Sequence, residues 1–304
     1  MTVLVTGGAG FIGSHIVEHF QGAAGVRVLD NLRTGTRSNL KGLACEFIEG
    51  SVTDRSLVRA AVAGVDYVFH LAAMVSVPES MAKPIECVEL NTIGTLIVLE
   101  EASRANVKKL CFSSSAAIYG DDPVVPKIET MAPTPRSPYA VAKLDGEFYC
   151  GIFRREGLIE TVALRYFNVF GPRQNPRGPY AAAVPIFIER ALKSEPLTIN
   201  GDGAQTRDFI YVKDVVAANV HFATSKSATG VFNVAAGGWI TINDLARKII
   251  AITKSNSPVE YGPRRAGDVD HSTAAVGKLR DAGFSVQTTF EDGLAATIEA
   301  FSHR

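Results

Sequence analysis

The chain has 304 residues with 31 basic and 31 acidic side chains, and this zero net charge offers no basic surface on which nucleic acid would bind. Its apolar content of 46% is enough for a substantial core, and its length suits one large α/β domain or a large and a small one. Four cysteines without C-x-x-C spacing indicate free thiols and no metal site. No apolar run has membrane-spanning length and no basic leader is visible, so we expect a cytoplasmic protein.

Short β-branched runs alternate with helical patterns along the first half of the chain. Strands are predicted at 2–6, 26–30, 45–49, 66–70, 108–114 and 161–166. Helices are predicted at 11–21, 54–63, 84–104 and 137–156. This alternation is typical of an α/β fold with a Rossmann-type, doubly wound parallel sheet.

The pattern changes after residue 168, where loops rich in glycine and proline precede a helix near 181–194 and a short strand at 197–199. Segment 208–236 is expected to return to the first domain. We therefore predict a first domain of 1–168 with 208–236, and a smaller, discontinuous C-terminal substrate domain of 169–207 with 237–304. The cleft between them is the expected substrate site.

A glycine-rich turn follows the first strand directly and precedes a helical pattern. Gly7, Gly10 and Gly13 would allow a tight turn, close approach of backbone N–H groups to phosphate, and close packing of the helix. The helix N-terminus would add donors and partial positive charge. The turn predicts a site for a dinucleotide pyrophosphate; the alternative is a turn-rich loop without a ligand.

Asp30 closes the second predicted strand, where a carboxylate can accept both ribose hydroxyls of NAD and would repel the 2′-phosphate of NADP. NAD is therefore the expected cofactor. Arg33 and Arg37 follow closely, and they leave a preference for NADP open.

Tyr139 and Lys143 are four residues apart on a predicted helix and share one of its faces. A lysine ammonium beside a tyrosine favours the phenolate. This spacing alone is equally typical of an exposed surface pair. It gains meaning from Ser113, Ser114 and Ser115, which end a strand at the edge of the sheet where ligands bind. A serine there can hydrogen-bond the reacting hydroxyl beside the tyrosine.

With these residues in this order, the chain resembles the extended short-chain dehydrogenase/reductase family, and within it the nucleotide-sugar 4-epimerases of the UDP-glucose and UDP-N-acetylglucosamine type. The similarity runs nearly end to end. Besides the motifs above, it rests on His70-Leu71-Ala72-Ala73, Ile118-Tyr119-Gly120, Arg165-Tyr166-Phe167-Asn168, Asn200-Gly201-Asp202-Gly203, Thr206-Arg207-Asp208-Phe209 and Arg265-Ala266-Gly267-Asp268.

The resemblance implies that Tyr139 is the base that takes the sugar 4-hydroxyl proton, that Lys143 lowers the tyrosine pKa and holds the nicotinamide ribose, and that Ser115 orients the hydroxyl. It also implies a set of residues that bind NAD. These are Gly7, Gly10, Phe11, Ile12, Gly13, Asp30, Asn31, Leu32, Arg33, Thr34, Gly35, Ser51, Val52, Leu71, Ala72, Ala73, Asn91, Ser113, Tyr139, Lys143 and Tyr166.

The implied substrate residues are Ser115 and Tyr139 at the sugar and a further group at the nucleotide. In that group, Asn168, Arg207 and Arg265 would bind the diphosphate, Asp268 the uridine ribose, and Ala183 and Asn200 the uridine. Two positions depart from the family: Ser51 replaces an aspartate that usually bonds adenine, and Val75 replaces a lysine common in glucose-type relatives.

The reaction implied by the resemblance is C4 epimerisation of a UDP-hexose through a transient 4-keto sugar. A dehydratase is disfavoured because Ala116 and Ala117 occupy the positions of its added acid and base. Ser272 stands where glucose-restricted relatives carry a tyrosine, which favours UDP-GlcNAc/UDP-GalNAc, with UDP-Glc/UDP-Gal as a second pair. The alternatives are a UDP-glucose-only or UDP-uronate epimerase, another nucleotide-sugar oxidoreductase, and a non-catalytic NAD-binding module.

Relatives pair through two long helices, so the resemblance implies a homodimer. The corresponding helices here are 84–104 and 137–156, and most of their apolar residues are expected to face the sheet. Those residues are Leu96, Val98, Leu99, Phe148, Tyr149, Ile152 and Phe153.

Overall fold

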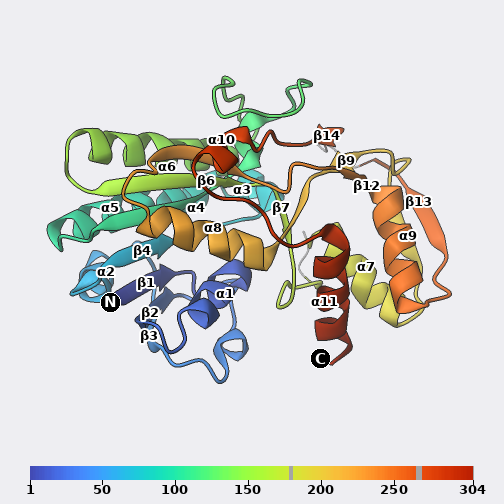
Figure 1. Cartoon of the computed structure of the whole chain (residues 1–304), viewed down its shortest axis with the longest axis horizontal. Helices are drawn as coiled ribbons and strands as arrows, with labels where there is room; N and C mark the ends of the chain where they lie inside the picture. Colours follow the sequence, from blue (N-terminus) through green and yellow to red (C-terminus); the bar gives the residue numbers. More distant parts are fainter. Residues whose placement is uncertain (178–180, 265–268, 304) are drawn as a thin grey trace. The chain divides into compact units, whose positions relative to one another are not determined.

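Seven strands form the main sheet of the computed structural model, which describes residues 1–177, 181–264 and 269–303 (Figure 1). They are β1 (Thr2–Thr6), β2 (Gly25–Asp30), β3 (Glu46–Glu49), β4 (Tyr67–His70), β5 (Lys109–Ser115), β6 (Glu160–Tyr166) and β11 (Gly230–Val234). Their order is β11-β6-β5-β4-β1-β2-β3. The pairings from β3 across to β6 are parallel, so the predicted Rossmann-type α/β fold is confirmed.

The strand order reverses at β1, which has β2 on one side and β4 on the other. In sheets of this kind, ligands bind beyond the carboxyl ends of the strands near such a reversal. The glycine turn after β1, Asp30 at the end of β2, the segment after β4 and Ser115 at the end of β5 all lie at this edge.

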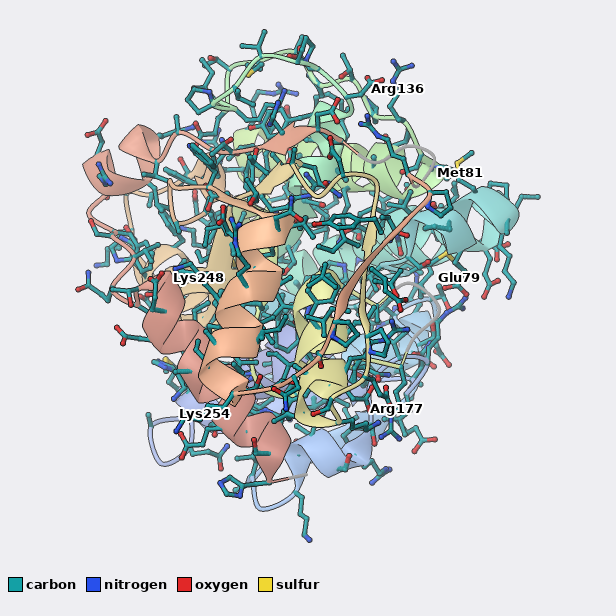
Figure 2. The ribbon with its side chains drawn as sticks, turned by 90° about the vertical axis from the view of Figure 1, so that its right-hand side faces the viewer. Glu79, Met81, Arg136, Arg177, Lys248 and Lys254 are labelled. Carbon is teal, nitrogen blue, oxygen red and sulfur yellow. The ribbon has the colours of Figure 1, made fainter. Side chains whose placement is uncertain are left out.

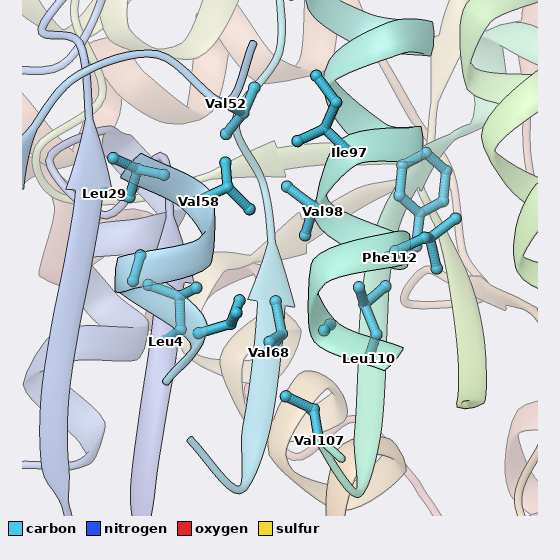
Figure 3. Close-up of a cluster of buried hydrophobic side chains, with 14 of the residues drawn as sticks. Leu4, Leu29, Val52, Val58, Val68, Ile97, Val98, Val107, Leu110 and Phe112 are labelled. Carbon is cyan, nitrogen blue, oxygen red and sulfur yellow. The ribbon is translucent and has the colours of Figure 1, made fainter. Parts of the chain in front are cut away.

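Helices cover both faces of the sheet. They are α1 (Phe11–His19), α2 (Arg55–Val62), α3 (Val77–Ala82), α4 (Pro84–Val88), the π-helical turn η2 (Glu89–Ile93), α5 (Gly94–Arg104), α6 (Pro138–Arg155) and α8 (Val212–Thr224), with short 3-10 turns η1 (Arg37–Leu40) and η3 (Ala116–Tyr119). Figure 3 shows the core on one face, where Val58 of α2 and Val98 of α5 pack over Val68 and Leu110 of the strands.

The predicted helix 84–104 is correct in extent but not in detail, because α4, η2 and α5 follow one another in it. Asn91 in the π-helical turn bonds the backbone of Met74, and Thr95 donates to the Asn91 carbonyl. Helix α3 was not predicted. Ser76 caps it by accepting from the Glu79 N–H, a Ser-x-x-Glu pattern that the sequence does contain.

The chain divides into two compact units: Met1–Gly120, Ala132–Tyr166 and Val216–Phe232 form the first, and the remaining segments form the second. The division differs from the expected boundaries in four places, two of which are the small shifts from 168 to Tyr166 and from 236 to Phe232. Asp121–Met131 groups with the second unit, since Lys127 pairs with Ala274. The segment from 208 to Val215 also groups there, since Phe209–Tyr211 pairs with Asn168–Phe170.

The second unit contains three small sheets and four helices among the residues that the structure describes. Its strands are β7 (Asn168–Phe170), β8 (Leu197–Asn200), β9 (Thr206–Arg207), β10 (Phe209–Tyr211), β12 (Ile240–Thr241), β13 (Val259–Gly262) and β14 (His271–Ser272). Its helices are α7 (Ala183–Leu192), α9 (Ile242–Thr253), α10 (Gly277–Asp281) and α11 (Phe290–Ser302). Lys248 of α9, labelled in Figure 2, pairs with Glu291 of α11 and joins the two helices.

The described parts of the chain were compared with what a membrane-spanning helix and a metal site require. There, no helix combines the length and apolar character needed to cross a membrane, and no cluster of His, Cys, Asp or Glu is suited to a metal ion.

Candidate functional site

The glycine turn after β1 forms a cradle of bare backbone in which an added side chain would collide with neighbouring backbone atoms. Gly7 has a left-handed φ of 72°, and a Cβ on Gly13 would lie 2.2 Å from the Gly7 carbonyl oxygen. Gly10 begins α1 without any side-chain cap. A helix start that lacks a capping side chain leaves its first N–H groups for a ligand, and the helix dipole favours an anion there. The cradle therefore fits a pyrophosphate.

Asp30 is fixed at the end of β2 by two backbone donors. Its Oδ2 accepts from the Ala9 N–H at 2.9 Å and its Oδ1 from the Leu32 N–H at 2.8 Å. Burial raises the pKa of Asp30, and these two hydrogen bonds oppose that rise. The oriented carboxylate is suited to accept ribose hydroxyls.

The two arginines near Asp30 already have carboxylate partners. Arg33 contacts Glu86 and lies 2.7 Å from Glu79, which is labelled in Figure 2. Arg37 pairs with Glu49 at 2.9 Å. Because both cations are partly neutralised, neither stands as an unpaired charge for a 2′-phosphate, and this favours NAD.

The rest of the predicted adenosine region packs around the turn. A Cβ on Gly35 would meet the Ala9 backbone at 2.7 Å, so the loop containing Asn31, Leu32 and Thr34 closes tightly on the glycine turn. Ser51 bonds Thr53 at 2.8 Å, and Val52, next to it, is buried. Phe11 and Ile12 occupy the first turn of α1.

A buried histidine, to which its sequence motif assigned no role, supports the segment after β4. His70 bonds Thr6 at 2.7 Å and Thr95 at 2.9 Å. Thr6 in turn accepts from the N–H groups of Leu71 and Ala72. Burial lowers the pKa of His70 to about 3, so the ring is neutral and fixes these residues through hydrogen bonds alone.

Asn91 was predicted to contact the cofactor, but its side-chain amide is engaged within the protein. Its oxygen accepts from the Met74 N–H at 2.7 Å and its nitrogen donates to the Met74 carbonyl at 3.0 Å. Asn91 thus holds the chain just beyond Leu71, Ala72 and Ala73.

Ser115, Tyr139 and Lys143 come together at the end of β5. Ser137 caps α6 by accepting from the Ala140 N–H, which fixes the helix start just before Tyr139. The Ser115 side chain lies close enough to the Tyr139 phenol to lower its pKa. The Lys143 ammonium lies 5.9 Å from the centre of the Tyr139 ring and donates to the Ser113 carbonyl at 2.6 Å.

The acid–base properties of this group differ from the simple lysine–tyrosine expectation. Burial raises the pKa of Tyr139, and the Ser115 side chain opposes the rise without a contribution from Lys143. Burial lowers the pKa of Lys143 to about 8. Lys143 does not help to lower the pKa of Tyr139 because its ammonium bonds the Ser113 carbonyl and not the phenol.

Tyr166, at the end of β6, is held between β5 and α8. Its hydroxyl bonds the Ser113 hydroxyl at 2.9 Å and donates to Asn219 of α8 at 2.8 Å. Burial raises the pKa of Tyr166, so it stays a neutral phenol. Asn219 had no local signal in the sequence, because it lies 53 residues beyond its partner.

In the second unit, several predicted substrate residues lie around two neighbouring strands. Ser272 of β14 is paired in register with Arg207 of β9. Asn168 donates to the Asp208 carbonyl through both its backbone and its side-chain nitrogen. Asn200 lines a cavity of ≈ 290 Å³ together with Gln205, Arg264, Asp270 and His271, among others.

Three other predictions concern this unit. Ala183 is the first residue of α7 and is half-buried. Arg265 and Asp268 lie outside the described residues.

The fold and the first unit's site define a dinucleotide-dependent enzyme of the Rossmann type, with a serine, a tyrosine and a lysine at the cofactor edge. Comparison with known proteins refines this class. Residues 3–235 match the NAD dependent epimerase/dehydratase family. The chain is 35% identical over 299 residues, and 97% of each sequence, to a putative UDP-glucose 4-epimerase of Methanocaldococcus jannaschii.

Two solved structures are similar over nearly the whole chain. A UDP-N-acetylglucosamine 4-epimerase from Methanobrevibacter ruminantium, in complex with UDP-N-acetylmuramic acid, is 41% identical with a TM-score of 0.96 and covers 99% of this chain and 98% of its own. A UDP-glucose 4-epimerase from Thermotoga maritima, with UDP-glucose, is 42% identical with a TM-score of 0.95, covering 100% and 99%.

The chain belongs to the NAD dependent epimerase/dehydratase family. It is a nucleotide-sugar epimerase with NAD as its cofactor, and the predicted resemblance, enzyme class and cofactor are confirmed.

Proposed function

We propose that this protein interconverts the C4 epimers of a UDP-hexose, with UDP-GlcNAc/UDP-GalNAc as its main pair and UDP-Glc/UDP-Gal as a second pair. The observation that carries the proposal is that Ser115, Tyr139 and Lys143 come together at the carboxyl end of β5. This arrangement places a proton acceptor and a hydroxyl-orienting group at the edge where the dinucleotide cradle also lies.

In the proposed reaction, Tyr139 takes the proton of the sugar 4-hydroxyl while Ser115 holds that oxygen. NAD held at the glycine turn and Asp30 would supply the acceptor and donor for the C4 hydride, so the cycle would have no net oxidation. Lys143 stays anchored to the strand through the Ser113 carbonyl and keeps positive charge near the phenol. After the 4-keto sugar turns over, Tyr139 returns the proton to its oxygen.

The residues after β5 favour epimerisation over elimination. Ala116 and Ala117 begin η3, and the Ala117 N–H donates to the Ser115 hydroxyl oxygen at 3.2 Å. Neither alanine can transfer a proton, so this turn supplies no added acid or base for loss of water.

The proposed nucleotide site consists of Asn168, Ala183, Asn200, Arg207, Arg265 and Asp268. Because the chain has no net charge, a doubly charged diphosphate needs local cations, and the Arg207 guanidinium provides one. Asn200 at the ≈ 290 Å³ cavity supplies an amide of the kind that a uracil ring pairs with.

The choice of sugar rests on Ser272, a small, half-buried side chain beside Arg207. A serine leaves room for a 2-acetamido group that a tyrosine would occupy. We expect Ser272→Tyr to lower the rate with UDP-GlcNAc much more than the rate with UDP-Glc, about 10-fold or more in their ratio. Ser285→Tyr, at an exposed position, is the matched control and should leave the ratio unchanged.

The experiment is a panel of UDP-sugars with separation of the epimeric products. An unchanged ratio in Ser272→Tyr would remove the size argument while leaving the reaction in place. A wild-type protein that carries NAD but converts none of the UDP-hexoses would overturn the proposed function.

A further inference from the structure

A buried carboxylate extends the acid–base helix face by one more turn. Tyr139, Lys143 and Glu147 follow one another at four-residue intervals on α6, so they line the same face. The Glu147 side chain is 4% exposed. It accepts from the Ser114 hydroxyl, and Ser114 is the middle member of the serine triplet that ends β5.

Arg165 of β6 completes this buried arrangement. Its Nε and Nη2 donate to the two carboxylate oxygens of Glu147 at 2.9 and 2.7 Å, a bidentate geometry with the arginine side chain 5% exposed. Its Nη1 donates to the Tyr119 hydroxyl at 2.8 Å. The pair therefore joins α6 to β5, β6 and the η3 turn that follows Ser115.

Each of the three serines that end β5 interacts with a different member of this face of α6. Ser113 accepts from Lys143 through its carbonyl, Ser114 donates to Glu147, and Ser115 lowers the pKa of Tyr139. We propose that Glu147, held by Arg165, is a positioning residue of the acid–base centre: it fixes the serine strand end against α6 and places a buried negative charge on the helix face of Lys143. This inference rests on the proposed function.

Besides Glu147, titratable groups from three elements interact with Lys143, namely Cys87, Cys150 and His70. Cys87 of α4 and Cys150 of α6 are buried thiols whose pKa values are raised by burial, so they are neutral. His70 of β4, with a pKa of about 3, is neutral as well. Burial lowers the pKa of Lys143 to about 8, and Glu147 is among the groups that oppose this fall.

A buried charge shifts the pKa values of neighbouring groups strongly because the effective dielectric constant around it is low. Its removal should therefore give a measurable change in those pKa values. Losing a negative charge makes every nearby proton easier to remove. In Glu147→Gln we therefore expect the coupled titration of Lys143 and Tyr139 to move to lower pH by about half a unit or more. Glu147→Asp keeps the charge, and its titration should stay within about 0.2 units of wild type while kcat falls.

The first measurement needs no substrate. Tyrosine ionisation is followed by ultraviolet absorbance in the NAD-loaded protein, and subtracting the curve of the matching Tyr139→Phe protein isolates Tyr139. This difference titration tests the inference even if the protein proves to act on no UDP-sugar. The second measurement is the pH profile of kcat for epimerisation, in which both limbs should move to lower pH in Glu147→Gln.

Glu101 provides a matched control. Its side chain is 1% exposed, and Arg55, Arg59 and Arg104 bind it, but it lies on α5 outside the site. Glu101→Gln should reduce stability and leave both pH curves unchanged. If Glu147→Gln does not fold, the double variant Glu147→Gln/Arg165→Met leaves no unpaired buried charge, and we expect it to move the curves in the same direction by a smaller amount.

A shift to lower pH in Glu147→Gln, absent in Glu147→Asp and Glu101→Gln, supports the inference. Coincident curves for Glu147→Gln and wild type, or an equal shift in Glu101→Gln, would overturn it.

Discussion

Tyr139 is a phenol whose burial works against the chemistry expected of it. Its pKa is raised by burial, and within the protein the Ser115 hydroxyl is the group that counters this. Lys143 bonds the Ser113 carbonyl and not the phenol. The tyrosine therefore depends on Ser115 for orientation and on the positive charge of oxidised nicotinamide for ionisation.

We expect Tyr139→Phe to lower kcat by about 100-fold or more, because general acid–base groups contribute on that scale. The substitution removes one oxygen and keeps the ring, so NAD content should be unchanged. Tyr149→Phe, on the same helix and also packed against the core, is the control and should retain activity. Both are measured by epimer formation from a UDP-hexose. Turnover within a few-fold of wild type in Tyr139→Phe would take the phenol out of the mechanism.

Which site residues are predictable from sequence depends on how local their signal is. Ser115, Tyr139 and Lys143 stand in patterns with a chemical meaning at fixed spacing. Asn219 does not, since nothing near it in sequence indicates that it receives the Tyr166 hydroxyl from 53 residues away. Glu147 lies on a helix that the sequence predicts, but its partner Arg165 is on β6, and only the fold brings β6 beside α6.

At the scale of elements, the alternation and periodicity of apolar residues predict the strands and helices, but they do not predict where a helix is interrupted. The π-helical turn Glu89–Ile93 sits inside a pattern that reads as one helix. Two tertiary contacts are made at this turn. Asn91 bonds the Met74 backbone, and Gly94 lies so near Val52 that a Cβ on Gly94 would be 2.7 Å from the Val52 side chain. Such contacts come from packing and leave no periodic signal.

Asp208 ties separate segments of the second unit together. Its carboxylate accepts from the N–H groups of Ala236, Gly237 and Ala274, while its own N–H donates to the Ser272 carbonyl. Burial raises the pKa of Asp208 from 3.8 to about 6, and the three backbone donors oppose that rise. The strands that carry Arg207 and Ser272 thus depend on one buried carboxyl.

The raised pKa fixes the sign of a pH effect. Between about pH 4 and 6 the folded protein binds this proton and the unfolded chain does not, so the contribution to stability is full below pH 4 and is lost as pH rises through 6. We expect the stability difference between wild type and Asp208→Asn to be larger at pH 4.5 than at pH 7, by about 1–2 kcal/mol.

The measurement is urea unfolding followed by circular dichroism at both pH values. At pH 7 the variant should already be less stable by about 1–3 kcal/mol, because an amide NH₂ faces backbone donors. Asp202→Asn is the control, since the Asp202 carboxylate is exposed and accepts from the nearby Ala204 N–H, and the pH dependence of this variant's stability should match wild type. A difference that is the same at both pH values would contradict the assignment.

At the scale of the whole molecule, the predicted interface helices separate into core and surface residues. Val98 and Leu99 are fully buried against the sheet. Phe148 and Ile152 of α6 are exposed, by 59% and 40%. The sequence could not make this division, because both sets have apolar spacing suited to a helix face and the sheet decides which face is covered.

The exposed set continues along neighbouring helices of the first unit. Val141, Phe148 and Ile152 form a stripe along α6, while Met81, Ile85 and Val88 add exposed apolar side chains on α3 and α4. Met81 is labelled in Figure 2. Contiguous apolar surface on a folded protein marks an interaction site.

We propose that a second copy of the chain covers this stripe. A two-fold axis through α6 would place Phe148 and Ile152 against the same residues of the other copy, so one patch satisfies both sides. Substituting a charged residue into that contact would bury it unpaired. We therefore expect the double variant Phe148→Glu/Ile152→Glu to be monomeric and the wild type dimeric, measured by light scattering during size-exclusion chromatography.

Leu158→Glu is the matched control for this experiment. Leu158 is 51% exposed but lies beyond the end of α6, so the same change of charge should leave the dimer intact. Because Phe148 and Ile152 are exposed in the single chain, the double variant should remain folded and keep its NAD. The two substitutions themselves should change the free energy of unfolding of the single chain by no more than about 0.5 kcal/mol. A wild type that elutes as a monomer at micromolar concentration, or a double variant that stays dimeric, would show that the stripe has another use.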